Sequence, residues 1–146
     1  MAEKFTESTR RALAFARYEA GRRGSSSLEP EHLLLGILRG RDERVMKLLA
    51  HFDVAAEDLA QPFQDDTLPA ATAASLKGDM TLSEGTKTVM AKAAAEKDAL
   101  GSESIAPEHL LLGVVSLESS PAARILAEKG INAAGLRHEV QRLATG

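Results

Sequence analysis

Apolar residues in the first part of the chain recur every three or four positions, the spacing of an amphipathic helix. Ala12, Leu13, Ala16 and Ala20 fall on one stripe, and Gly24 lies beyond its end. This pattern predicts a helix whose apolar stripe faces a core. Val, Ile and aromatic residues are too scarce and too irregularly placed to predict strands. The chain is therefore predicted to be all-α.

Three further helices follow from the same pattern. Pro30 suits the first position of a helix, where a missing backbone N–H costs little, and the following 33–36 segment, Leu-Leu-Leu-Gly, is apolar nearly all round. A helix that is apolar on every side must lie inside the protein. The pair Leu48 and Leu49 marks a third helix, and Leu59 marks a short fourth one that Pro62 interrupts.

The pattern then repeats at an offset of 77 residues. The segment 30–36, Pro-Glu-His-Leu-Leu-Leu-Gly, recurs letter for letter at 107–113, and 19 of the 59 residues in 5–63 are identical to their partners. Thr6 and Ser83 occupy equivalent N-cap positions, each followed by a glutamate. We therefore predict an eight-helix bundle of two tandem four-helix repeats, 5–63 and 82–144, related by a pseudo-twofold axis. A linker is expected at 64–81, where helical periodicity is absent.

Composition and charge limit the classes of partner and site that are expected for this chain. A chain of 146 residues with 44% hydrophobic residues can bury a core as a single domain, and its formal net charge of −3 offers no field that attracts nucleic acid. Cysteine is absent, which excludes disulfides and thiolate metal sites. No secretion signal or membrane-spanning apolar run is recognisable. We expect a monomeric, cytoplasmic protein without cofactors.

The duplicated Glu-His pairs are the most conspicuous polar groups. Neighbouring residues on a helix point about 100° apart, so Glu31 and His32, with Glu108 and His109, are not expected to share a metal ion. For the histidines we predict a structural role, in which each ring fixes the preceding loop by a hydrogen bond to the backbone. For the glutamates two interpretations stay open: a carboxylate that stabilises its helix start, or one that binds a cationic group of a visiting chain.

No catalytic constellation is recognisable. The sequence lacks a nucleophile elbow, a His-Glu-x-x-His helix and a Gly-x-x-x-x-Gly-Lys-Ser/Thr loop, so it is not expected to hydrolyse ATP by itself. Phe15 and Tyr18 lie away from the apolar stripe of their helix, and the second repeat has Lys92 and Ala95 in their place. They are either isolated aromatics on the outer face or a contact patch present only in the first half.

The motifs together resemble the double Clp-N repeat, which precedes the ATPase rings of Clp (Hsp100) unfoldases. The resemblance rests on 5–7 (Phe-Thr-Glu), 28–36, its copy at 105–113, and 130–133 (Gly-Ile-Asn-Ala) at the last helix. It implies a non-catalytic domain that receives unfolded or tagged substrates, or adaptor proteins, for a Clp ATPase ring. Roles in stress response and in the regulation of proteolysis would follow.

The resemblance also implies a site. In ClpC-type domains a Thr stands where this chain has Pro30 and Pro107, and it helps to bind phosphorylated arginine; the prolines lack that hydroxyl and one N–H, and Glu29 would repel phosphate. The pattern is closer to ClpB-type domains, in which a groove between the halves binds extended hydrophobic segments. Thr6, Ser102 and Glu108 would line its polar edge.

The chain is either part of a longer Clp ATPase or a stand-alone regulator. Short helices with Gly-containing connections are also compatible with a helix-turn-helix DNA-binding regulator, which the acidic balance opposes, and Glu31 with Glu108 could form the carboxylate pair of a glycosidase. On the favoured hypothesis casein binds weakly, and Glu108→Ala reduces that binding while changing stability by less than about 1 kcal/mol, as for a surface residue.

Overall fold

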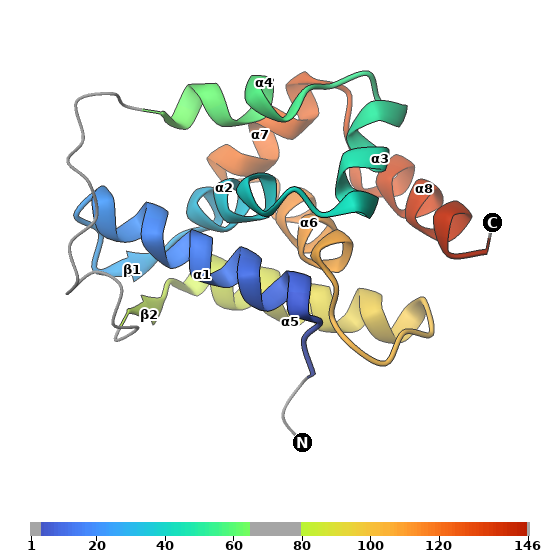
Figure 1. The fold of residues 1–146 in the computed structure, drawn as a ribbon, viewed down its shortest axis with the longest axis horizontal. Coiled ribbons are helices and arrows are strands. Elements are labelled where there is room, and N and C mark those ends of the chain that lie inside the picture. Colours follow the sequence, from blue (N-terminus) through green and yellow to red (C-terminus); the bar gives the residue numbers. More distant parts are fainter. Residues whose placement is uncertain (1–3, 65–79, 146) are drawn as a thin grey trace.

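Two similar sets of four helices make up the described part of the protein, as the sequence predicts (Figure 1). The computed structural model describes residues 4–64 and 80–145. In these residues the elements are α1 (Glu7–Arg22), β1 (Ser27–Leu28), α2 (Pro30–Gly40), α3 (Glu43–His51), α4 (Ala56–Ala60), the 3-10 turn η1 (Gln61–Phe63), β2 (Thr81–Leu82), α5 (Glu84–Ala99), α6 (Pro107–Ser116), α7 (Pro121–Glu128) and α8 (Ala133–Thr145).

The starts of the helices follow the predicted local chemistry. The side chains of Thr6 and Ser83 accept hydrogen bonds from the backbone N–H of Thr9 and Thr86, which satisfies one free donor at the start of α1 and of α5. The proline that begins α2 and the one that begins α6 stand at the first helical position. The predicted capping and the predicted proline positions are confirmed.

The two apolar helices α2 and α6 form the centre of the molecule. In Figure 1 they lie in the middle of the ribbon, with α1 and α5 below and α4 and α7 above. Leu33, Leu34, Leu110, Leu111 and Leu112 are all 0% exposed, which confirms that the Leu-Leu-Leu-Gly segments lie inside. In the described part of the chain no single helix is long and apolar enough to cross a membrane, and α6 with α7 passes that test only as a pair bent by 96°.

Equivalent residues of the two halves exchange hydrogen bonds. The carbonyl of Ile105 in the second half accepts from the N–H of Thr6 at 3.1 Å and from the Thr9 hydroxyl at 2.7 Å. The carbonyl of Leu28 in the first half accepts from the N–H of Ser83 at 3.1 Å and from the Thr86 hydroxyl at 2.7 Å. The halves therefore fold against each other in a reciprocal way, as the predicted pseudo-twofold relation requires.

The expectation that the chain has no strands is wrong at four residues. The two-residue strands β1 and β2 pair in parallel, and Phe5 forms the equivalent single bridge with Ile105 (Figure 1). Each pairing joins the segment before a first helix to the loop before the other half's second helix, so backbone position creates it and no side-chain alternation reveals it. Thr81, the last residue of the predicted linker, lies in β2, and residues 65–79 of that linker lie outside the described residues.

Candidate functional site

A crevice of about 610 Å³ opens where both halves contribute side chains. From the first half come the residues before and at the start of α1 and of α3, and from the second half come the α5–α6 loop and the start of α6. The lining residues are Thr6, Ser8, Asp42, Glu43, Arg44, Ser102, Glu103, Ser104, Ala106, Pro107, Glu108 and His109. The crevice thus brings together three of the predicted site residues, Thr6, Ser102 and Glu108.

Local hydrogen bonds hold the walls of the crevice in place. The cross-half bond from the N–H of Thr6 fixes the start of α1 beside the α5–α6 loop. Asp42 caps α3, because its carboxylate accepts from the N–H of Arg44 at 3.1 Å and from that of Val45 at 3.2 Å. Three helix starts therefore meet at one opening, and each is anchored independently of any ligand.

Glu108 is the most buried carboxylate of the crevice, with 4% of the residue exposed. An Oε2 atom of Glu108 lies 3.3 Å from Nη1 of Arg44, whose side chain is 54% exposed. The ion pair joins α6 of the second half to α3 of the first. The interpretation of Glu108 as a surface residue is therefore wrong: its removal leaves a pocket at a helix start and an unpaired arginine, so its effect on stability is not that of a surface change.

Glu31, the equivalent residue of the first half, lies elsewhere. It is half-buried, it is not among the residues that line the crevice, and among the described residues no hydrogen bond or ion pair of its side chain is found. An ion pair like that of Glu108 is missing from the described residues because Pro121 occupies the position in the second half that Arg44 occupies in the first. The two glutamates thus share a motif but not an environment, and Glu108 alone of the two lines the crevice.

Both histidines have the predicted structural role. Nδ1 of His32 accepts from the N–H of Glu29 at 3.0 Å, and Nδ1 of His109 accepts from the N–H of Ala106 at 2.8 Å. Burial lowers the pKa of each ring, so both stay neutral near pH 7 and keep the acceptor that the loop needs. Within the described ranges no group of three or more His, Asp or Glu side chains is arranged to hold a metal ion.

Phe15 and Tyr18 lie on α1 and do not line the crevice. The guanidinium of Arg39 on α2 stacks over both rings, 5.5 Å from the centroid of Phe15 and 4.8 Å from that of Tyr18. Both aromatic residues are half-buried, so the interpretation as isolated aromatics on the outer face is wrong. They belong to a cluster that is specific to the first half.

Sequence reasoning missed Arg44 and three buried glutamates. Glu19, Glu96 and Glu139 are 3–6% exposed, and each has at least one cationic partner. A signal was present for two of them, because Glu19 and Glu96 are identical at the repeat offset. For Arg44 there was none, since the second repeat has a proline at that position.

The chain matches a known protein family over nearly its whole length. Residues 4–143 match the family described as Clp repeat (R) N-terminal domain. The chain is 33% identical over 136 residues to the chaperone protein ClpB of Propionibacterium freudenreichii subsp. shermanii, covering 92% of this chain and 16% of that protein. It is 27% identical over 140 residues to the negative regulator of genetic competence ClpC/MecB of Bacillus subtilis, covering 96% of this chain and 17% of that one.

Solved structures agree with this result. The N-terminal domain of ClpD from Arabidopsis thaliana superposes with a TM-score of 0.71 at 25% identity, covering 98% of this chain and 96% of that domain. The Hsp104 N-terminal domain from Candida albicans has a TM-score of 0.74 at 19% identity, with 97% and 92% covered, and supports the fold. The chain spans about a sixth of the length of the curated relatives. It belongs to the family of Clp repeat N-terminal domains, the one that its duplicated Pro-Glu-His-Leu-Leu-Leu-Gly motif resembles.

Proposed function

We propose that this chain is a non-catalytic protein-binding module, which presents unfolded or tagged substrates, or adaptor proteins, to a Clp/Hsp100 ATPase ring. It does so either as the N-terminal domain of such an ATPase or as a stand-alone regulator, acting as a monomer in the cytoplasm. The names of its relatives, a chaperone ClpB and a regulator ClpC/MecB, support this class of function. The whole relatives are about six times longer, so their activity lies beyond what this chain could supply alone.

The observation that carries the proposal is the crevice between the halves. It gathers Thr6, Ser102 and Glu108 from segments about 100 residues apart in the sequence, and it mixes hydroxyl, carboxylate and apolar surface. An extended polypeptide needs this combination, because its backbone offers N–H and C=O groups while its side chains vary. Four carboxylates and one arginine line the opening, which favours segments that carry Lys or Arg.

Arg44 has a specific place in this proposal. Its guanidinium already binds the Glu108 carboxylate, and a cationic group of a substrate would compete for the same oxygens. Since about half of the Arg44 side chain is exposed, it can leave without disturbing the core. Arg44 therefore competes with the cationic group of the substrate for the carboxylate of Glu108.

The test uses fluorescently labelled, unfolded casein and measures its binding by anisotropy. Glu108→Gln keeps the side-chain volume but removes the charge, so binding should weaken by about 10-fold or more, since a charge-assisted hydrogen bond contributes ~1.5–3 kcal/mol. Arg44→Ala should strengthen binding, because it frees the carboxylate. The matched control is Glu128→Gln at an exposed position at the end of α7, which should bind as the parent does.

Circular dichroism melts identify the folded fraction of each variant, so that affinities refer to folded protein. If Glu108→Gln and Arg44→Ala shift the affinity in the same direction, or if neither shifts it, the carboxylate is not part of the binding site. Steep, salt-dependent binding of duplex DNA would instead favour a DNA-binding regulator.

A further inference from the structure

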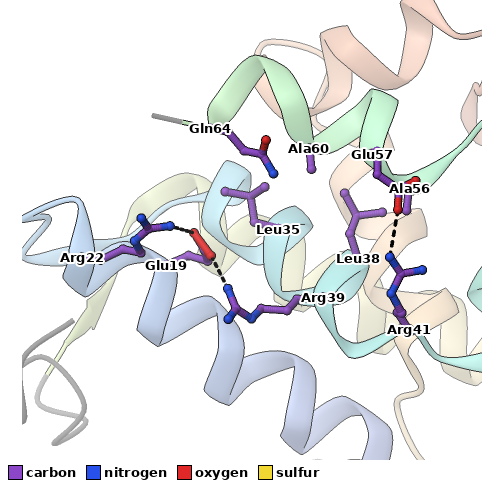
Figure 2. A pocket seen from close by; sticks show the side chains of 10 residues that line it. All are labelled: Glu19, Arg22, Leu35, Leu38, Arg39, Arg41, Ala56, Glu57, Ala60 and Gln64. Carbon is purple, nitrogen blue, oxygen red and sulfur yellow. Dashed lines mark hydrogen bonds and ion pairs between the residues drawn. The ribbon is translucent and has the colours of Figure 1, made fainter. Parts of the chain in front are cut away.

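A second cavity, of about 240 Å³, lies in the first half between α1, α2 and α4. Leu35, Leu38 and Ala60 form its apolar part, as Figure 2 shows, and charged side chains surround it. Arg22 and Arg39 lie on either side of the Glu19 carboxylate at one end, and Arg41 pairs with Glu57 at the other. This arginine-rimmed cavity shares no lining residue with the crevice between the halves.

The second repeat serves as an internal reference for what the fold itself requires. Arg22, Arg23, Arg39 and Arg41 all lie in or beside the arginine-rimmed cavity, and their counterparts at the offset of 77 are Ala99, Leu100, Ser116 and Glu118. Phe15 and Tyr18, which hold Arg39 by stacking, likewise have non-aromatic counterparts. The second half forms the same four-helix unit without any of these six residues, so the cluster is not needed for the fold.

The two repeats also differ in the residue that faces the buried glutamate from the last helix. In the second half Arg137 extends from α8 to the buried Glu96, with contacts of 2.9 Å from Nε and 2.6 Å from Nη2. In the first half the counterpart of Arg137 is Ala60 on the shorter α4, and the counterpart of Glu96 is Glu19. A cavity of about 370 Å³ remains beside Arg137, and its lining residues Ser116 and Glu118 are the counterparts of Arg39 and Arg41, so the two cavities differ in the charge of their rims.

The arginines around the cavity retain donors for a ligand. Arg23 and Arg39 hydrogen-bond the Glu19 carboxylate, whereas Arg22 approaches it only to 3.9 Å. The Nε of Arg22 is buried and has no hydrogen-bond partner among the described residues, which is unfavourable unless an acceptor arrives. The side chains of Arg41 and Glu57 form an ion pair and are 64% and 69% exposed. A carboxylate of a ligand can therefore replace Glu57 as the partner of Arg41 at little cost in free energy.

The charges around the arginine-rimmed cavity indicate which kind of partner it can bind. Four arginines stand against the two carboxylates of Glu19 and Glu57, so this surface is locally basic in a chain whose net charge is −3. We propose that the arginine-rimmed cavity is a docking site for a short acidic segment of a partner protein. An apolar side chain of that segment packs on Leu35 and Leu38, and flanking carboxylates bind Arg22 and Arg41. This site is separate from the crevice proposed for substrates.

The probe is an acetylated hexapeptide, Glu-Glu-Leu-Glu-Asp-Leu, titrated into the ¹⁵N-labelled chain. Saturable shifts are expected for backbone amides of Leu35, Leu38, Arg41 and Ala60, and not for those around Glu108. The same peptide with Lys in place of its acids should cause no shifts, and the peptide with Gly in place of its leucines should bind at least 5-fold more weakly. An oligothymidylate serves as a ligand that offers negative charge without leucine side chains. If it, or the peptide with Gly in place of leucine, binds as tightly as the hexapeptide and shifts the same amides, the surface recognises only negative charge and the proposal fails.

Ala60→Arg is the decisive variant, because it installs in the first half the arginine that the second half carries. It adds positive charge but places a long side chain in the cavity wall that Leu35 and Leu38 also form, so peptide binding should fall at least 5-fold. Stronger or unchanged binding would overturn the proposal. The double variant Arg41→Asn and Arg22→Ala should also weaken binding at least 5-fold, and Asn suits the left-handed backbone at position 41 (φ 48°). The charge-matched control is the double variant Arg124→Ala and Lys129→Ala, at exposed positions in α7 and at its end.

The two proposed sites can fail separately. Casein binding should be unchanged in Ala60→Arg and reduced in Glu108→Gln, whereas hexapeptide binding should follow the opposite pattern. A hexapeptide that shifts the amides around Glu108, and leaves those of α2 and α4 in place, would overturn the docking site while leaving the crevice as the binding surface.

Discussion

Replacing Gly36 by alanine should lower the free energy of unfolding by about 2–3 kcal/mol, in the range typical of overpacked cores. Gly36 lies in α2 where that helix touches α1 most closely. A methyl group there would collide with the backbone of Ala12 and of Ala16, which cannot rotate away as a side chain can. The two helices would have to separate, and the apolar stripe of α1 would lose contacts along its length.

Gly40→Ala is the matched control, because Gly40 lies in the same helix and a methyl group there meets nothing within 4 Å. Helix propensity alone should leave that variant equal to the parent or up to ~1 kcal/mol more stable. Urea denaturation measures both values. If Gly36→Ala is as stable as Gly40→Ala, close approach at this glycine does not set the spacing of α1 and α2.

The sequence predicted the elements well because the repeat doubled each signal. The two copies of Pro-Glu-His-Leu-Leu-Leu-Gly predicted α2 and α6, and Thr6 and Ser83 predicted the starts of α1 and α5. Local patterns of this kind are set within one or two helical turns, so no knowledge of the tertiary structure is needed. The loop-fixing role of the two histidines was predictable for the same reason.

Contacts between the halves could not be predicted in the same way. Strand pairing of β1 with β2 depends on two segments more than 50 residues apart, and it leaves no pattern in four residues. Thr9 and Thr86 are identical at the repeat offset, yet a buried threonine in an otherwise polar helix start does not indicate which carbonyl it reaches. The burial of Glu108 likewise depends on Arg44, a residue of the other half.

The candidate site was therefore predicted in part. Thr6, Ser102 and Glu108 do meet in one crevice, whereas Glu31, at the equivalent start of α2, lies outside it and faces a half that has Pro121 at the position of Arg44. Phe15 and Tyr18 belong with the arginines of the first half, a grouping that only the position of Arg39 reveals. Where the two repeats differ in sequence, the structure assigns different surroundings to equivalent residues.

Arg137→Ala should cost about 2 kcal/mol of stability at pH 7. Glu96 is 3% exposed, and Arg137 holds its carboxylate by a two-point contact between α8 and α5. Removing one partner of a buried ion pair typically costs ~3–5 kcal/mol, but Lys92 remains 3.4 Å from the carboxylate and Arg137 is itself 35% exposed, so the expected loss is smaller. Arg137→Lys, which keeps the charge but not the planar fork, should lose about half as much.

The pH dependence separates this ion pair from simple packing. The hydrogen bonds from Arg137 lower the pKa of Glu96 below its ordinary value of 4.5, so the stabilisation is complete above that pH and disappears as the pH falls through the lower folded-state pKa. The difference between the parent and Arg137→Ala should therefore be large at pH 7 and shrink towards pH 3. Urea titrations at the two pH values measure it, with Arg124→Ala on α7 as the exposed control. An equal loss at both pH values would mean that the Arg137 stem stabilises the domain by packing, and that the charge on Glu96 contributes nothing.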